Sequence, residues 1–244
     1  MLLDLAARIL LLPVLIGQAI FVVIRIPKLP EASGPRAGTV GQGPRLRLLV
    51  LGDSSAAGVG AATQDKALLG RVLNSLSAHY TIDYELVART GARTGDALNW
   101  LRGRPAKTYD VVICALGGND VTKGTPLRRF LRLQMDLVDH LQFDRGAQLV
   151  VVSDLPPVAH FPALPQPLRW VLGRQANRLE HRRRQLLNTR RVCIPLAFDL
   201  SLDVSAMASD GFHPGPDAYA AWGKAAAAII RERSLRLDDD AASP

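Results

Sequence analysis

The stretch Leu48–Gly60 reads "LLVLGDSSAAGVG" and joins the pattern of a buried strand to a polar turn. Four apolar residues are followed by Gly52, Asp53 and two serines, and then by small residues. A short apolar run that ends in a glycine-containing turn is typical of a strand in a parallel sheet, and acids and hydroxyls cap helices well. The stretch therefore predicts a strand, a turn and a helix. It leaves open whether Asp53, Ser54 and Ser55 only cap that turn or carry chemistry.

From residue 45 onward, short apolar runs alternate with longer segments of helical period. This alternation is typical of a parallel sheet covered by helices on both faces. The sequence therefore predicts one α/β domain, a three-layer α/β/α sandwich with a five-stranded parallel sheet. The predicted strands cover 46–51, 82–87, 110–116, 148–153 and 192–198. The predicted helices cover 67–79, 94–102, 125–141, 168–188 and 216–234.

The composition of the 244 residues is that of a globular protein, with 48% hydrophobic residues and a formal net charge of +8. The arginines are scattered and no aromatic-plus-basic module accompanies them, so we expect no nucleic-acid partner. A solvated basic face or an anionic membrane surface fits the charge better. Cys114 and Cys193 each lie in an apolar run, and their spacing matches neither a zinc site nor a disulfide framework.

The N-terminal region contains an uncharged apolar run over 9–24, "ILLLPVLIGQAIFVVI". We favour an uncleaved membrane anchor, although the run is short for a span; a cleaved signal peptide and a helix packed on the domain are the alternatives. Basic residues after the run outnumber those before it, which slightly favours a cytoplasmic over an exported domain. The expected organisation is an anchor or signal segment over 1–26, a linker over 27–44, the folded domain over 45–234 and a flexible acidic tail over 235–244.

One further polar stretch follows a predicted strand, and another precedes the last predicted helix. "ALGGNDV" contains Asn119, whose amide could donate to a developing negative charge or cap the next helix. "SDGFHPGPDAY" places Asp210 three residues before His213, a spacing at which the carboxylate can orient the imidazole. Because the carboxyl ends of parallel strands meet at one edge of a sheet, we expect these residues to approach Ser54. Together they supply a nucleophile, a base and an oxyanion donor.

These stretches resemble the four sequence blocks of the SGNH hydrolases, also called the GDSL esterase/lipase family. "GDSS", a glycine loop after the second strand, "GGND" and "DGFHP" follow one another in the family's order between about 46 and 230. The resemblance implies a flavodoxin-like fold with Ser54 as nucleophile and Asp210 and His213 as its acid and base. It implies an oxyanion hole formed by Ser54, Gly91 and Asn119, and it implies no metal or other cofactor.

Two departures from the family pattern leave alternatives open. Ser55 stands where a leucine is usual, so the second hydroxyl could be the reactive one. The second block has Ala88 where many members have asparagine, and Gly95 competes with Gly91 as the oxyanion donor.

The resemblance and the residues predict a serine hydrolase that cleaves carboxylic esters of small molecules or lipids, with no obligate protein partner. Thioesterase, lysophospholipase and carbohydrate O-deacetylase or acyltransferase activities remain open, because the fold and the nucleophile do not determine which acyl group the enzyme accepts. A non-enzymatic, membrane-tethered binding domain is the alternative from another class. The basic segment over 161–191 is either a solvated helix or a lid that faces the membrane, with Phe161 and Trp170 on its apolar side.

Overall fold

The computed structural model describes residues 10–197 and 206–242, and within them it forms a sheet of six strands. The order across the sheet is β1-β3-β2-β4-β5-β6; β1 is antiparallel to β3, and the other neighbouring strands are parallel. The strands are β1 (Ala37–Gly41), β2 (Arg45–Gly52), β3 (Thr81–Ala88), β4 (Val111–Ala115), β5 (Leu149–Ser153) and β6 (Cys193–Leu196).

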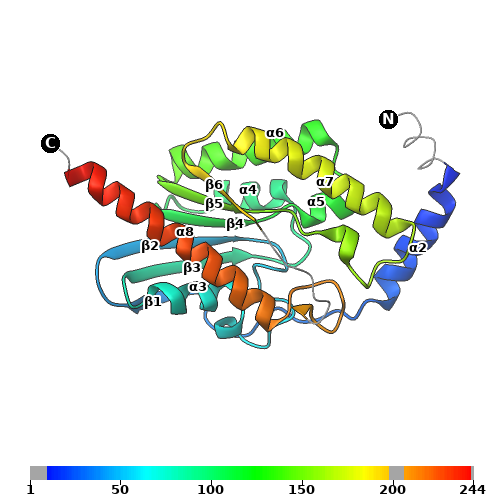
Figure 1. Cartoon of the computed structure of the whole chain (residues 1–244), viewed down its shortest axis with the longest axis horizontal. Coiled ribbons are helices and arrows are strands. Elements are labelled where there is room, and N and C mark those ends of the chain that lie inside the picture. Colours follow the sequence, from blue (N-terminus) through cyan, green and yellow to red (C-terminus); the bar gives the residue numbers. More distant parts are fainter. Residues whose placement is uncertain (1–9, 198–205, 243–244) are drawn as a thin grey trace.

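Helices cover both faces of this sheet, as Figure 1 shows. One face packs against α3 and α8, and the other against α4, α6 and α7. The α-helices are α2 (Leu12–Arg25), α3 (Leu68–Leu76), α4 (Thr94–Arg102), α5 (Gly118–Thr122), α6 (Leu127–Asp139), α7 (Leu168–Leu187) and α8 (Pro216–Ala242). Three short helical turns are η1 (Gln64–Lys66), η2 (His140–Asp144) and η3 (Val158–His160).

Strand β2 shows how the sequence generates these layers. Leu48 and Val50 belong to the apolar cluster under α3 and α8, whereas Leu49 and Leu51 belong to the cluster under α4, α6 and α7. Successive side chains of a strand point to opposite faces, so a strand buried on both faces must be apolar throughout. The predicted three-layer α/β/α fold is confirmed.

The predicted sheet lacked one strand. β1 lies inside the segment 27–44 that was expected to be a linker, so the expected linker is wrong at this point. Strand β1 pairs with β3, with Ala37 opposite Glu85 at one end and Gly41 opposite Thr81 at the other. Its sequence, "AGTVG", has two glycines and one partly buried valine, and therefore gives little strand signal. At the other end of the chain, α8 continues to Ala242, beyond the predicted end at 234.

The N-terminal apolar run forms α2, which packs on the domain. Leu15 and Val22 contact the apolar cluster around α7, and the Gln18 side chain hydrogen-bonds with the backbone of Gln166 (2.5 Å) and Leu168 (2.9 Å). Within the described residues, no helix has both the length and the apolar character needed to cross a bilayer. The structure therefore does not support the transmembrane anchor that we favoured, and α2 corresponds to the packed-helix alternative.

Some expectations fall on parts of the chain outside the described residues. They are residues 1–9 of the N-terminal segment, residue 198 at the end of the last predicted strand and residues 243–244 of the tail.

A buried arginine on α7 holds the ends of two central strands together. Arg183 is 1% exposed and donates to the carbonyl oxygens of Leu116 (3.3 Å) and Ser153 (2.8 Å). It also forms an ion pair with Glu180 (2.6 Å), whose carboxylate accepts the N–H of Leu155 (2.9 Å). Because these backbone groups lie at the end of β5 or just after β4 and β5, the pair fixes two of the loops that begin at the carboxyl edge of the sheet.

Replacing Arg183 with leucine should lower the free energy of unfolding by about 1 to 3 kcal/mol, because it removes the donors of two buried carbonyl oxygens and leaves the partly buried Glu180 carboxylate with its Arg184 ion pair (3.2 Å) but without the closer Arg183. Arg182→Leu is the matched control, since Arg182 is exposed on the same helix, and it should change stability by no more than about 0.5 kcal/mol. Urea denaturation of the two variants measures the difference. Equal stabilities would contradict the structural role assigned to Arg183.

Candidate active site

The turn after β2 places Ser54 at the carboxyl edge of the sheet. The N–H groups of Ala57 and Val59 donate to the carbonyl oxygens of Asp53 (2.9 Å) and Ser54 (3.0 Å), so the chain coils at once after the strand. Gly52 permits this, because a Cβ there would come within 2.7 Å of the Ala115 carbonyl oxygen on β4. Ser54 is 7% exposed, and its side chain borders a cavity.

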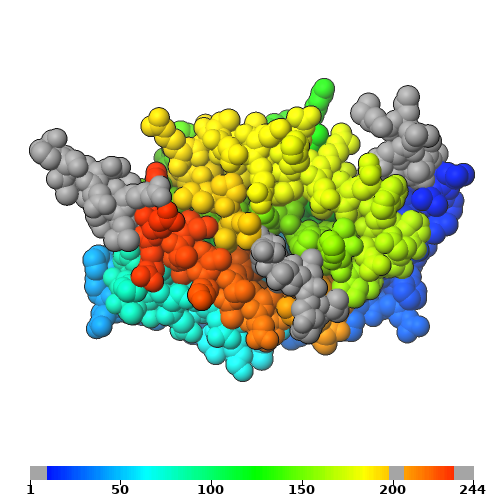
Figure 2. All heavy atoms as spheres, viewed as in Figure 1, coloured from blue at the N-terminus to red at the C-terminus, as the bar shows by residue number. Residues whose placement is uncertain are grey.

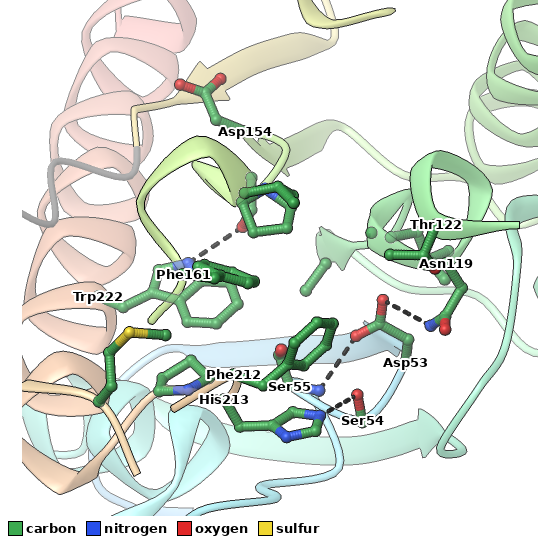
Figure 3. A pocket seen from close by; sticks show the side chains of 18 residues that line it. Asp53, Ser54, Ser55, Asn119, Thr122, Asp154, Phe161, Phe212, His213 and Trp222 are labelled. Carbon is green, nitrogen blue, oxygen red and sulfur yellow. Dashed lines mark hydrogen bonds between the residues drawn. The ribbon is translucent and has the colours of Figure 1, made fainter. Parts of the chain in front are cut away.

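The structure brings Asp210, His213 and Ser54 together. His213 Nε2 lies 2.9 Å from Ser54 Oγ, and His213 Nδ1 lies 2.6 Å from Asp210 Oδ2 (Figure 3 shows His213 and Ser54). The second Asp210 oxygen accepts the N–H groups of Phe212 (2.9 Å) and His213 (3.0 Å). The short turn between acid and base thus fixes the imidazole with one nitrogen on the carboxylate and the other on the serine hydroxyl.

The surroundings of Asp210 favour its charged form. Burial of its side chain acts to raise its pKa, but hydrogen bonds from the His213 ring and from two backbone N–H groups outweigh burial and lower the pKa. Asp210 is therefore an anion at neutral pH. An anion at this position stabilises a positive charge on His213.

Asn119 reaches the same site from the loop after β4. Gly117 has φ +119°, a left-handed conformation that favours glycine, and it starts the short helix α5 on which Asn119 lies. The Asn119 amide nitrogen faces Asp53 Oδ2 at 3.4 Å, while Asp53 Oδ1 accepts the Ser55 N–H at 3.0 Å. Asp53 thus orients two neighbours of Ser54, a role that the sequence left open.

Asp53 itself is almost completely buried, at 6% exposure. Burial raises its pKa to about 6, although the Ser55 N–H, the charge of His213 and the Asn119 amide all oppose this increase. The two carboxyl groups of the site, on Asp53 and Asp210, are therefore shifted in opposite directions.

Ser55 differs from Ser54 in its contacts. Both residues line the cavity, but the imidazole of His213 hydrogen-bonds to Ser54. The backbone of Ser55 donates to Asp53 instead. This arrangement favours Ser54 over the alternative hydroxyl.

Gly91 is less directly placed than the other predicted residues, because it is not among the residues that line the cavity. It has φ +80°, and its carbonyl oxygen accepts a hydrogen bond from Lys123 Nζ (2.7 Å) at the end of α5. Among the described residues, no acceptor is found for the backbone N–H of Gly91 or of Ser54. The competing Gly95 is part of α4 and faces Leu133 in a different cavity, so it is the weaker candidate.

The cavity beside Ser54 is mainly apolar. Figure 3 shows Phe161, Phe212 and Trp222 around it, with Ser54 and Asn119 at its polar end. Trp222 comes from α8 and donates its indole N–H to Ser153 Oγ (3.0 Å). The sequence did not identify this wall, because its members come from separate segments. Phe161, which the lid alternative for segment 161–191 placed on an apolar side facing the membrane, is 4% exposed and lines the cavity instead. The remaining apolar lining is supplied by Ala115, Leu116, Pro156, Val158, Met207 and Pro214.

Comparison with known proteins places the chain among lipases and esterases. The GDSL-like Lipase/Acylhydrolase family matches residues 50–221. The search of curated proteins found no match. Among solved structures, the lipase Lip_vut3 from a goat rumen metagenome has a TM-score of 0.62 and 17% sequence identity, covering 75% of this chain and 96% of that one.

Two further solved structures have the same fold. The psychrotrophic esterase EstA from Pseudoalteromonas sp., inhibited by monoethylphosphonate, has a TM-score of 0.54 and 18% identity over 78% of this chain and 98% of its own. The lipase/acylhydrolase from Enterococcus faecalis has a TM-score of 0.54 and 17% identity over 77% and 96%. At these identities the likeness concerns the fold, whereas the family match spans most of the chain. The chain therefore belongs to the GDSL-like Lipase/Acylhydrolase family and is an ester-hydrolysing enzyme.

Proposed function

We propose that the protein hydrolyses carboxylic esters through an acyl-enzyme formed on Ser54. The observation that carries this proposal is the continuous hydrogen-bonded chain from Asp210 through His213 to Ser54 Oγ. A serine hydroxyl is a weak nucleophile at neutral pH and needs a base within hydrogen-bond distance. Among the described residues, His213 is the imidazole that meets this requirement at Ser54.

In the first half of the reaction, Ser54 Oγ attacks the ester carbonyl carbon while its proton moves to His213 Nε2. Asp210, held as an anion, stabilises the imidazolium that results. The imidazolium then protonates the leaving alcohol, and the acyl group remains on Ser54. In the second half, His213 takes a proton from water while the water oxygen attacks the acyl carbonyl carbon. The imidazolium then returns the proton to Ser54 Oγ as the bond between Oγ and the acyl carbon breaks, and the carboxylic acid leaves.

The tetrahedral intermediates carry a negative oxygen that needs hydrogen-bond donors. We assign this role to the N–H groups of Ser54 and Gly91 and to the side-chain amide of Asn119. Support comes from the two backbone N–H groups, which have no acceptor in the described part of the chain, and from the orientation of Asn119 by Asp53. Such donors act mainly on the transition state, where the charge develops.

The apolar cavity supports an apolar acyl group as the part of the substrate that is held beside Ser54. Phe161 and Phe212 have no hydrogen-bonding group for a sugar or a phosphate, and the Trp222 indole N–H is already donated to Ser153. An acyl chain, in contrast, would lose contact with water on entering. Thioesters and lysophospholipids share this acyl group, so these alternatives differ from the main proposal only in the leaving group. Membership of an enzyme family argues against the non-enzymatic binding domain.

Ser54→Ala should abolish ester turnover and labelling by a fluorophosphonate, because it removes the proposed nucleophile. Ser55→Ala is the matched control and should keep most of the activity, since Ser55 does not contact His213. Turnover of a soluble p-nitrophenyl ester and the mass of the labelled protein measure both effects. Loss of labelling in Ser55→Ala with retention in Ser54→Ala would overturn the assignment.

Asn119→Ala should lower kcat roughly 100- to 1,000-fold with little change in KM, because the amide is proposed to bind the oxyanion rather than the ground-state ester. Thr122→Ser is a suitable control, since Thr122 lines the same cavity on the same short helix and keeps its hydroxyl. Steady-state kinetics separate the two parameters. A change confined to KM would make Asn119 a substrate-binding residue instead.

Asp53→Asn should become more stable relative to the wild type as the pH rises. The folded pKa of Asp53 is about 6, above its ordinary value of 3.8, so its stabilising contribution is complete below 3.8 and is lost as the pH rises through 6. Asparagine does not titrate. The difference in unfolding free energy should therefore shift by up to about 3 kcal/mol in favour of Asp53→Asn between roughly pH 4 and pH 7. Urea denaturation across this range measures it, and a constant difference would contradict the raised pKa.

A further inference from the structure

Helix α2 leaves most of its apolar surface without a partner among the described residues. Leu15, Gln18 and Val22 face the domain, and the other side chains point outward. Figure 2 shows α2 in blue at one end of the molecule. The exposed fraction of its large apolar residues ranges from 48% to 75%, and these residues are Leu12, Val14, Ile16, Ile20, Phe21, Val23 and Ile24.

The shape of this surface indicates what can cover it. The exposed side chains surround a convex helix on every side except the stripe that contacts the domain. A folded protein would have to enclose the helix in a groove, whereas the hydrocarbon of a bilayer adapts to a convex surface. An apolar helix face that lies in the plane of a bilayer, with basic residues around it, is the usual geometry of interfacial helices.

The charge around α2 suits an anionic lipid surface. Arg25 ends the helix and Lys28 follows it, and both are exposed. No acidic residue lies between Leu12 and Arg25. Lys and Arg close to an anionic bilayer each strengthen binding.

Helix α7, which contacts α2, also has exposed residues that suit an anionic lipid surface. Trp170, Arg174, Arg178 and Arg182 are exposed and recur every four residues, so they lie along one side of α7. The Arg174 guanidinium stacks over the Trp170 ring at 5.4 Å. Tryptophan prefers the boundary between headgroups and acyl chains, and arginine can bind the phosphates above it.

The position of α2 connects this surface with the candidate active site. Leu15 and Val22 pack on an apolar cluster that also contains Val158 and Phe161, and these two residues line the cavity beside Ser54. A surface bound through α2 would therefore lie at the end of the domain that holds the cavity.

We propose that α2 docks in the plane of a bilayer that contains anionic lipid, with Trp170 and an arginine row of α7, Arg174 and Arg178, at the headgroups. The surface, consisting of the exposed residues of α2 with Trp170, Arg174 and Arg178, is the lipid-docking surface. Its consequence, that ester substrate reaches Ser54 from the bilayer, rests on the proposed function, whereas docking itself does not.

Co-sedimentation of the full chain with phosphatidylcholine vesicles, with and without phosphatidylglycerol, tests the proposal. Phe21→Glu should weaken binding at least roughly tenfold, because it removes a large apolar side chain from the surface and adds a negative charge. Phe143→Glu is the matched control: Phe143 is 70% exposed, lies on η2 and is outside the lipid-docking surface. Equal binding of Phe21→Glu and the wild type would overturn the proposal.

A second pair of variants tests the arginine row. Arg178→Glu should weaken binding to vesicles with phosphatidylglycerol by roughly fivefold or more and leave binding to phosphatidylcholine alone nearly unchanged. Arg231→Glu makes the same charge change on α8, which covers the other face of the sheet, and should have little effect. Equal losses in both variants would show that only the net charge attracts the protein, and would overturn the docking surface.

Two measurements separate the proposal from its competitors. Ser54→Ala should bind vesicles like the wild type, so docking can be judged even if the proposed hydrolysis fails. Phe21→Glu should hydrolyse a soluble short-chain ester at the wild-type rate, which shows that it folds. Light scattering tests a second copy of the chain as the occupant: a wild-type dimer that Phe21→Glu dissociates, without vesicle binding by either protein, would overturn the proposal.

Discussion

The site depends on the close approach of two segments that are far apart in the sequence. The loop that carries His213 passes so near the turn after β2 that a Cβ at Gly60 would lie 2.2 Å from the Pro214 carbonyl oxygen. Tyr219, at the start of α8, strengthens the contact by donating its hydroxyl to the Val59 carbonyl oxygen (2.7 Å). Only with this contact can an imidazole lie within hydrogen-bond distance of Ser54, so a single glycine limits how the active site can be assembled.

The two buried carboxyl groups show how neighbouring acids can serve different purposes. Asp210 receives three N–H donors and remains an anion, which suits a partner that becomes positive. Asp53 lies deeper, receives one close backbone N–H, and has a pKa of about 6. Its function is local geometry: it connects the turn of Ser54 to the amide of Asn119. The difference arises from the number of donors and from burial, since both residues are aspartates.

The sequence predicted the parts of the protein whose causes are local. The central strands are continuous apolar runs, and α4 occupies the predicted residues 94–102. Asp210 and His213 were recognisable as a pair because three residues and one turn separate them. β1 was missed because its pairing with β3 depends on tertiary context rather than on its own residues. The packing of α2 was only an alternative to the favoured anchor for a similar reason, since Gln18 finds its partners about 150 positions away. The apolar wall of the cavity is also assembled from distant segments, so no single stretch of sequence predicts it.

The two outer strands of the sheet affect whether a strand of another molecule can pair with this protein. An exposed sheet edge offers unpaired N–H and C=O groups to which a strand of another molecule can bind. One edge is β1, which has only five residues and two glycines. The other is β6, a strand of four residues whose third residue, Pro195, has no N–H to donate. Both edges are poor templates for a further strand, so the longer inner strands β2 and β3 are shielded from pairing with a strand of another molecule.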